Sequence, residues 1–168
     1  MKKLLILMLC IGASFAVKAQ KLEGFICVLI NEARVNFELD FSKANIHGMS
    51  EADFARYEKD WNKDMPAIIG GFVENLNEEI DGLVRFGHYT TAKYKLKVEV
   101  IEVSLNGNYD SDAYLLDNEG NTVAKITGLF AKGGVFGTKL NLIKDGSKHS
   151  GELLGEILHK ALKRCNRH

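Results

Sequence analysis

The sequence lacks the features that most often reveal a function. Its 22 basic residues are balanced by 22 acidic ones, so it has no excess of positive charge with which to neutralise nucleic-acid phosphates. It contains no G-x-x-x-x-G-K-[ST], G-x-G-x-x-G, G-x-S-x-G, S-x-x-K or H-E-x-x-H motif. These are signatures of phosphate loops, dinucleotide sites, serine acyl transfer and zinc peptidases. We therefore expect no nucleic-acid partner, no cofactor and no metal, and we identify no catalytic residue.

Long apolar runs are missing beyond the amino terminus. The chain starts MKKLLILMLCIGASFAVKAQ, with two lysines, an apolar stretch over residues 4–17 and a small residue at Ala19. This pattern is typical of a secretory signal peptide, and the stretch is shorter than the roughly 20 residues of a membrane-spanning helix. We expect residues 1–19 to be a signal peptide and residues 20–168 to be one exported domain, periplasmic or secreted. No transmembrane segment is expected after cleavage.

Cysteine is scarce. Cys10 follows Leu9 rather than a small residue, so we do not expect it to carry a lipid, and signal cleavage would leave only Cys27 and Cys165. Export permits a disulfide between these two. A cysteine in an apolar run such as FICVLI is equally typical of a small buried hydrophobic residue. The sequence leaves the pairing open, because it does not give the Cα separation that a disulfide requires.

Alternating apolar and polar residues predict several strands. RVNFELDF (34–41) alternates throughout, which indicates one face in water, and FICVLI (25–30) predicts a covered strand joined to it as a hairpin. Residues 94–103 alternate with a slip at Val100–Ile101, which predicts either a bulge or a stretch covered on both faces. Two β-rich runs on either side of residues 117–121 predict a second hairpin.

Helical spacing of apolar residues predicts two or three helices. Ser50 resembles the start of a capping box and predicts a helix through residue 62, and Pro66 predicts the first turn of the next helix. In that second helix, Gly70–Gly71 indicates close backbone packing or a kink. A further, amphipathic helix is predicted at the carboxyl terminus over residues 153–162. Three aromatic residues at helical spacing are expected in the core: Phe54, Tyr57 and Trp61. The predicted fold is an α+β two-layer sandwich, a largely antiparallel sheet with two to three helices packed on one face.

Two polar clusters could suggest chemistry, and the sequence argues against both. Asn108, Asp110 and Asp112 have the spacing of an EF-hand loop, but Ala113 stands where the sharp turn needs glycine and the flanks predict strands. The second cluster is Ser147, His149 and Ser150. Neighbours in sequence rarely form a catalytic triad, so helix capping explains its two serines better.

Glycine is what the chain has in quantity, with seven between residues 125 and 158. In KGGVFGT (132–138) they surround Val135 and Phe136, and the following KLNLI alternates like a short strand, so we expect no helix end there to bind phosphate. Glycine also predicts mobility. Two interpretations stay open: the apolar pair contacts a partner, or it folds back onto the core. We predict the contact, made by Gly133, Gly134, Val135, Phe136, Gly137 and Lys139.

The order of predicted elements, with ITGLFAKGGVFG (126–137) leading to LLGEILHKAL (153–162), resembles small exported modules of bacterial cell envelopes. Examples are the amino-terminal domain of TolB, the curli-secretion protein CsgG and the penicillin-binding-protein activator LpoB, together with exported families of no assigned function. The resemblance implies an assembly or binding module without a catalytic site, and a protein partner in the envelope. The alternatives are an envelope enzyme, such as a hydrolase with a dispersed site, and a small-ligand carrier.

Overall fold

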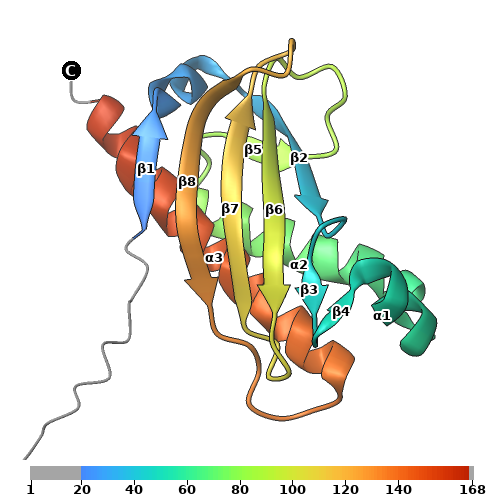
Figure 1. Cartoon of the computed structure of the whole chain (residues 1–168). Helices are drawn as coiled ribbons and strands as arrows, with labels where there is room; N and C mark the ends of the chain where they lie inside the picture. The colour runs from blue at the N-terminus through green and yellow to red at the C-terminus, as the bar shows by residue number, and fades with distance from the viewer. Residues whose placement is uncertain (1–19, 167–168) are drawn as a thin grey trace, which may run out of the picture.

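A mixed sheet of eight strands carries two long helices on one of its faces (Figure 1). The computed structural model describes residues 20–166. The strands are β1 (Lys21–Gly24), β2 (Arg34–Asp40), β3 (Asn45–Ile46), β4 (Met49–Ser50), β5 (Arg85–Gly87), β6 (Lys95–Val103), β7 (Tyr109–Leu116) and β8 (Thr122–Ala131). The helices are the 3-10 helix η1 (Ile26–Asn31), α1 (Glu51–Tyr57), α2 (Trp61–Ile80) and α3 (Lys139–Cys165). The predicted α+β class is confirmed.

The sheet is mixed, so the prediction of a largely antiparallel sheet needs correction. Its order is β1-β8-β7-β6-β2-β5. The pairs from β1 to β6 in this order are antiparallel, but β2 is parallel to both of its neighbours, β6 and β5. The chain reaches β5 from β2 by way of α1 and α2, and such a helical crossover is how two parallel neighbours are connected.

The apolar run FICVLI does not form the predicted strand, and the predicted hairpin with residues 34–41 is therefore absent. The run forms η1, in which Ile26 and Leu29 are buried. Residues three apart lie on the same side of a 3-10 helix, so this pair makes one apolar contact surface. A short apolar run does not by its periodicity distinguish a strand from a helical turn.

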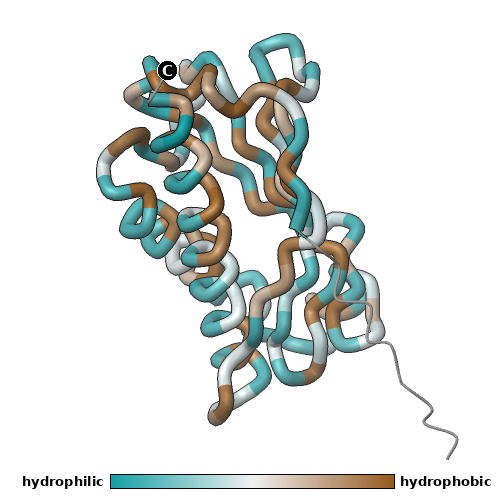
Figure 2. Tube along the Cα trace, turned by 90° about the vertical axis from the view of Figure 1, so that its left-hand side faces the viewer, coloured by the Kyte–Doolittle hydropathy of each residue, from teal (hydrophilic) through white to brown (hydrophobic). Residues whose placement is uncertain are grey.

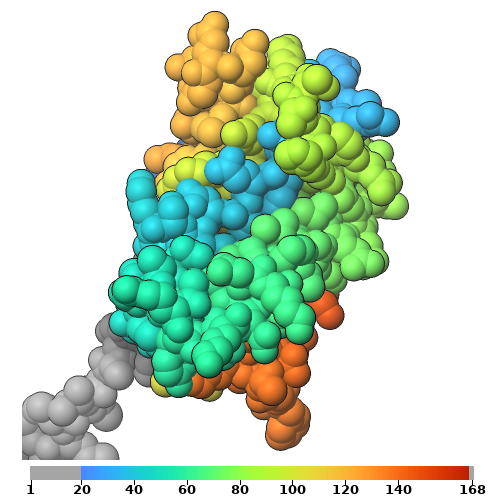
Figure 3. All heavy atoms as spheres, turned by 90° about the vertical axis from the view of Figure 1, so that its right-hand side faces the viewer, coloured from blue at the N-terminus to red at the C-terminus, as the bar shows by residue number. Residues whose placement is uncertain are grey.

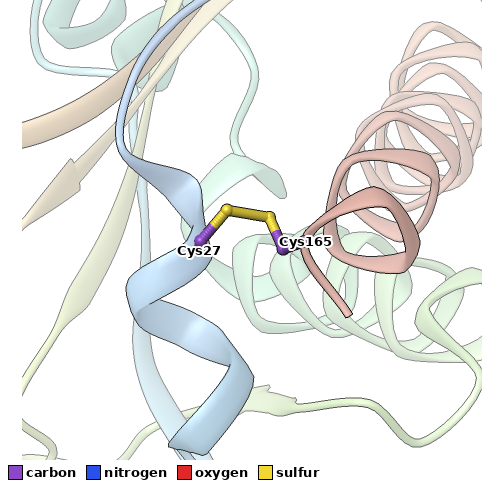
Figure 4. Close-up of a disulfide and its surroundings, with 2 residues drawn as sticks. All are labelled: Cys27 and Cys165. Atoms are coloured by element: carbon purple, nitrogen blue, oxygen red, sulfur yellow. A yellow bond between two sulfur atoms is a disulfide. The ribbon is translucent and has the colours of Figure 1, made fainter. Parts of the chain in front are cut away.

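The disulfide that the sequence left open is present. Cys27 of η1 is bonded to Cys165 at the end of α3, with a Cα–Cα distance of 5.6 Å (Figure 4). The bond joins positions 138 residues apart and ties the start of the domain to its last helix.

Several local predictions are confirmed. Ser50 caps α1 by accepting a hydrogen bond from the Asp53 N–H, and the register of β6 against β7 shifts between Val100 and Glu102. The hairpin of β7 and β8 closes with a bond from the Asp117 N–H to the Asn121 carbonyl at 3.0 Å.

The ends of the first two helices differ from the prediction. Helix α1 stops at Tyr57, and α2 begins at Trp61, so Pro66 lies inside α2 rather than in its first turn. Helix α2 starts before Pro66 because Trp61 is held in place at its first residue. The Trp61 side chain is buried, and its indole N–H donates to the Glu51 carboxylate at 2.9 Å. Proline does not show from sequence which turn of a helix it occupies.

The last helix is much longer than predicted. KLNLI is the first part of α3, not a strand, because Leu140 and Ile143 are buried three residues apart. The two serines inside α3 do not cap a helix as predicted. Ser147 donates to the Ile68 carbonyl of α2 at 2.8 Å, and Ser150 donates to the Gly146 carbonyl in its own helix at 2.8 Å. No helix within residues 20–166 is both long and apolar enough to cross a membrane.

Glycines of α3 allow α2 and α3 to touch backbone to backbone. A Cβ atom at Gly151 would overlap the Phe72 carbonyl of α2, and one at Gly155 would lie 2.9 Å from the Leu76 carbonyl oxygen. Within the predicted Gly70–Gly71 contact, only Gly71 is close to α3, where an added Cβ would lie 3.1 Å from Lys148 Cγ. An added Cβ at Gly70 meets nothing within 4 Å. Gly71 is therefore close to a side chain of α3, and the predicted close approach of backbones occurs at Gly151 and Gly155 rather than at this pair.

The opposite face of the sheet is polar, as the alternation in residues 34–41 predicted. Ion pairs cross it between neighbouring strands, at 2.9 Å for Lys95 with Glu38 and 2.9 Å for Lys97 with Asp40. The Lys95–Glu38 pair is the more exposed of the two, and exposed ion pairs contribute little stability. The face therefore remains in water while the buried face packs on α2 and α3.

The two helical glycines allow a matched test of the helix contact. We expect Gly151→Ala to lower the free energy of unfolding by about 1 to 3 kcal/mol, since the new methyl group overlaps α2. The control Gly70→Ala should raise it by about 0.5 to 1 kcal/mol, because alanine favours the helix and its methyl group meets open space. Urea denaturation of both variants measures the two changes. Equal effects would contradict the proposed backbone contact.

Candidate functional site

The β6–β7 turn and the β8–α3 loop lie at the same end of the sheet (Figure 1), and both carry exposed apolar side chains. Val135 and Phe136 of the loop have exposed fractions of 83% and 88%, and Leu105 of the turn has 68%. Two more exposed apolar side chains, Ile101 and Phe130, lie near the ends of β6 and β8. The name apolar end is used below for Ile101, Leu105, Phe130, Val135 and Phe136.

Val135 and Phe136 do not fold back onto the core. Their exposed fractions exclude the core-capping interpretation that the sequence left open. Figure 2 shows a hydrophobic tip on the loop at the lower end of the molecule. The other interpretation, contact with a partner, stays a prediction.

The base of this loop is fixed by its glycines. The Gly133 N–H donates to the Asn108 side-chain oxygen at 2.8 Å, and a Cβ at Gly133 would overlap the Asn106 carbonyl. A Cβ at Gly134 would lie 2.6 Å from the Asp145 carboxylate. These glycines allow close approach of neighbouring chain segments, which is a different role from the mobility predicted from the sequence.

The same backbone packing includes the β6–β7 turn and α3. Gly107 of the turn has a φ of 73°, and a Cβ there would overlap the Leu142 carbonyl of α3. A Cβ at Gly146 of α3 would overlap the Gly107 carbonyl in return. The turn thus meets both the loop and the helix without side chains between them. Sequence reasoning did not single out Gly107 or Gly146, although glycine in a turn and inside an amphipathic helix is a signal for such contact.

Lys139, the last predicted contact residue, is the first residue of α3 and lies beside α1. Its ammonium donates to the Tyr57 hydroxyl at 3.0 Å and lies 4.7 Å from the centre of that ring. Tyr57, predicted to be in the core, is 59% exposed. Through this contact the start of α3, which follows the loop of the apolar end, lies against the last residue of α1.

The helix begins directly after the loop, contrary to the expectation from KLNLI. Thr138 caps α3 by accepting a hydrogen bond from the Asn141 N–H at 3.3 Å. Gly137 has a φ of 131° and lies against the Asn141 side chain. A Cβ atom added at Gly137 would lie 3.0 Å from the Asn141 Cβ. The Thr138 hydroxyl therefore satisfies the Asn141 N–H in the first turn of α3, and Gly137 lies beside the same turn.

His47 lies between β3 and β4 beside a hollow of about 510 Å³ that Leu105 also lines. Its backbone is left-handed, with a φ of 54°, and its ring packs edge-on against Phe54 at 5.1 Å. Burial of the ring lowers the pKa of His47, and the positive charge of Lys139 lowers it further.

The other polar residues considered from the sequence have structural partners and do not converge. Asn108 binds the loop as described, and the Asp112 carboxylate accepts from the Gly128 N–H at 2.9 Å, with both flanks in strands. His149 Nδ1 is 2.8 Å from the Lys132 carbonyl oxygen, away from the Ser147 hydroxyl that binds α2. Within residues 20–166, no three His, Cys, Asp or Glu side chains are grouped so that they could hold a metal ion.

Comparison with known proteins gives no family for the chain. No protein-family model matches it, and no curated protein matches it either. Among solved structures, the PelC dodecamer from Paraburkholderia phytofirmans is similar, with 14% sequence identity and a TM-score of 0.47, covering 83% of this chain and 96% of that one. A variant of the same dodecamer has 16% identity and a TM-score of 0.45, with the same coverage. Both scores lie below the level usually taken to indicate a shared fold.

The lowered pKa of His47 predicts a pH dependence of stability. The folded protein keeps the ring neutral down to a lower pH than the unfolded chain, which takes up a proton near the ordinary pKa of about 6.5. The stability contributed by the neutral ring is therefore complete above that pH and is lost as the pH falls below it. We expect His47→Asn, which tolerates the left-handed backbone, to lose less stability than the wild type between about pH 7.5 and pH 5.5. Urea midpoints at both values measure this, and parallel losses in the two proteins would contradict it.

Proposed function

We propose that the chain is an exported binding or assembly module of the bacterial cell envelope, without catalytic activity. It contacts a protein partner through the apolar end. The observation that carries the proposal is the exposure of Val135 and Phe136, at 83% and 88%, on a loop whose base is packed backbone to backbone. A connection between β8 and α3 has no need of two large apolar side chains in water.

The energetics favour a protein surface as the occupant of this end. Burying a valine or phenylalanine side chain contributes about 1.5 to 3 kcal/mol. A few such side chains on a fixed base give the apolar centre that protein interfaces have. Because the base holds the loop in place, binding orders little additional chain and loses little of this free energy.

Export is supported by two independent features. Residues 1–19, which lie outside the described residues, have the pattern of a signal peptide. The disulfide between Cys27 and Cys165 persists in an oxidising compartment such as the periplasm or the extracellular medium. The resemblance to TolB, CsgG and LpoB modules belongs to this proposal, and so does the partner in the envelope.

Phe136 is the residue whose replacement tests the proposal. We expect Phe136→Ser to change the free energy of unfolding by no more than about 0.5 kcal/mol, because the ring makes no core contact. The same variant, expressed with its leader and captured from cell envelopes after crosslinking, should lose the partner that the wild type retains.

Phe25 provides a matched control, since its ring is 63% exposed beside η1, at the other end of the sheet. Phe25→Ser should retain the captured partner. The proposal fails if Phe136→Ser captures the same partner as the wild type, or if both serine variants lose it equally.

The leader can be tested separately by the intact mass of the exported protein. We expect a mature chain that starts at Gln20, since Val17 and Ala19 occupy the small-residue positions read by signal peptidase. Two cysteines should react with an alkylating reagent only after reduction. A mass that retains Met1, or a lipid mass on Cys10, would overturn the assignment of an exported soluble chain.

A further inference from the structure

Strand β2 has one edge that is only partly covered. It pairs with β6 from Asn36 to Asp40, but on its other side it pairs with β5 only from Arg34 to Asn36. Among the described residues, no strand continues beside Phe37–Asp40 on that side. A short stretch of sheet edge is therefore open.

The backbone groups at this edge can be assigned from the pairing. The Asn36 N–H donates to the Tyr94 carbonyl at 3.0 Å, towards β6. Peptide groups of successive residues in a strand point to alternate sides. The N–H and carbonyl of Leu39 consequently point away from β6, towards the open side, as does the carbonyl of Phe37.

An apolar groove of about 720 Å³ runs beside this edge, between β2 and α2. Phe37 and Leu39 line it from the strand, and Met65, Ile69 and Val73 line it from the helix. In Figure 3, which faces this side, the blue atoms of β2 reach the surface between the green atoms of α2 and the yellow-green atoms that follow β5.

Two residues of α2 that disfavour a helix face the groove. Pro66 and Gly70 lie one turn apart and both line it. Proline removes a helix hydrogen bond, and glycine costs about 1 kcal/mol relative to alanine. The fold does not require glycine at 70, because an added Cβ meets nothing within 4 Å. What the glycine provides is space in the groove.

Two acidic side chains lie next to the groove, beyond its Gly70 and Val73 end. The adjoining hollow on α2, which shares Gly70 and Val73, is lined by Glu74 and Glu78 with Arg85 across from them. No ion pair between described residues includes either glutamate. A ligand with a basic residue at this end would match the local charge.

We propose that the open edge of β2 binds an extended, basic segment of a partner protein, which adds a strand to the sheet. Its backbone pairs with Leu39 and Phe37, its alternate apolar side chains enter the groove, and a lysine or arginine lies against Glu74 and Glu78. Strand addition accounts for the free backbone groups and the apolar groove together, because side chains two residues apart point the same way. This surface is distinct from the apolar end.

The probe is a library of random linear peptides, displayed on phage and selected on the disulfide-bonded mature chain. We expect the enriched sequences to share alternating apolar residues with a lysine or arginine at one end. A peptide of the consensus is then titrated against the wild type and three variants by fluorescence anisotropy. Gly70→Phe should weaken binding by at least about tenfold. Gly70→Ala, which adds only one methyl group to the groove, should weaken it much less, and Phe136→Ser should bind like the wild type.

Backbone methylation separates strand addition from simple apolar binding. Peptides N-methylated at alternate residues should fall into two classes, one that loses binding and one that retains it, because only every second N–H faces β2. Exchange of Glu74 and Glu78 for lysine should weaken binding of the basic peptide.

The outcomes that would overturn the proposal are distinct from failure of the apolar end. It fails if no sequence is enriched, if the consensus binds Gly70→Phe as well as Gly70→Ala, or if methylation at every position is tolerated. Loss of binding in Phe136→Ser but not in Gly70→Phe would assign the peptides to the apolar end. Self-association of the chain that Gly70→Phe abolishes would make a second copy the occupant and would also overturn it.

Discussion

The structure depends on one constraint: α3 packs on its neighbours without side chains between the backbones. Gly151 meets the Phe72 carbonyl of α2, and Gly146 meets the Gly107 carbonyl of the β6–β7 turn. A larger residue at either position would overlap the neighbouring backbone, so these contacts determine where α3 lies against α2 and the turn. Its amino-terminal end then determines where the KGGVFGT loop leaves the domain, and its carboxyl-terminal end places Cys165 beside Cys27.

The importance of such tertiary contacts also explains which parts of the fold the sequence predicted and which it did not. Elements with a strong local pattern were right, such as the alternation in β2, the cap at Ser50 and the bulge after Val100. Elements that depend on tertiary contact were wrong. FICVLI is apolar on every side, and whether it forms a strand or η1 is decided by α3 and the disulfide. KLNLI alternates over only five residues, so the burial of Leu140 and Ile143 decides for a helix.

The parallel part of the sheet was missed for a related reason. Alternation in a sequence shows that a strand has one wet face, but not which strand lies beside it. The pairing of β2 with β5 follows from the α1–α2 crossover, which brings the chain back parallel to β2. Of the candidate site, the sequence singled out Val135 and Phe136, which are exposed; that they contact a partner stays a prediction. Leu105 and Gly107, which complete its surface and base, come from a turn that carries no motif of its own.

The two proposed surfaces differ in what they can recognise. The apolar end presents side chains on a fixed loop, so its specificity depends on the shape of the partner's surface. The β2 edge presents backbone groups, which any extended chain can pair with, so its specificity must come from the groove and from Glu74 and Glu78. Surfaces of such different chemistry can be occupied together, since one lies at the end of the sheet and the other along its side. A module with both could hold a folded partner at one position and an extended segment at the other, and α3 keeps the distance between them constant.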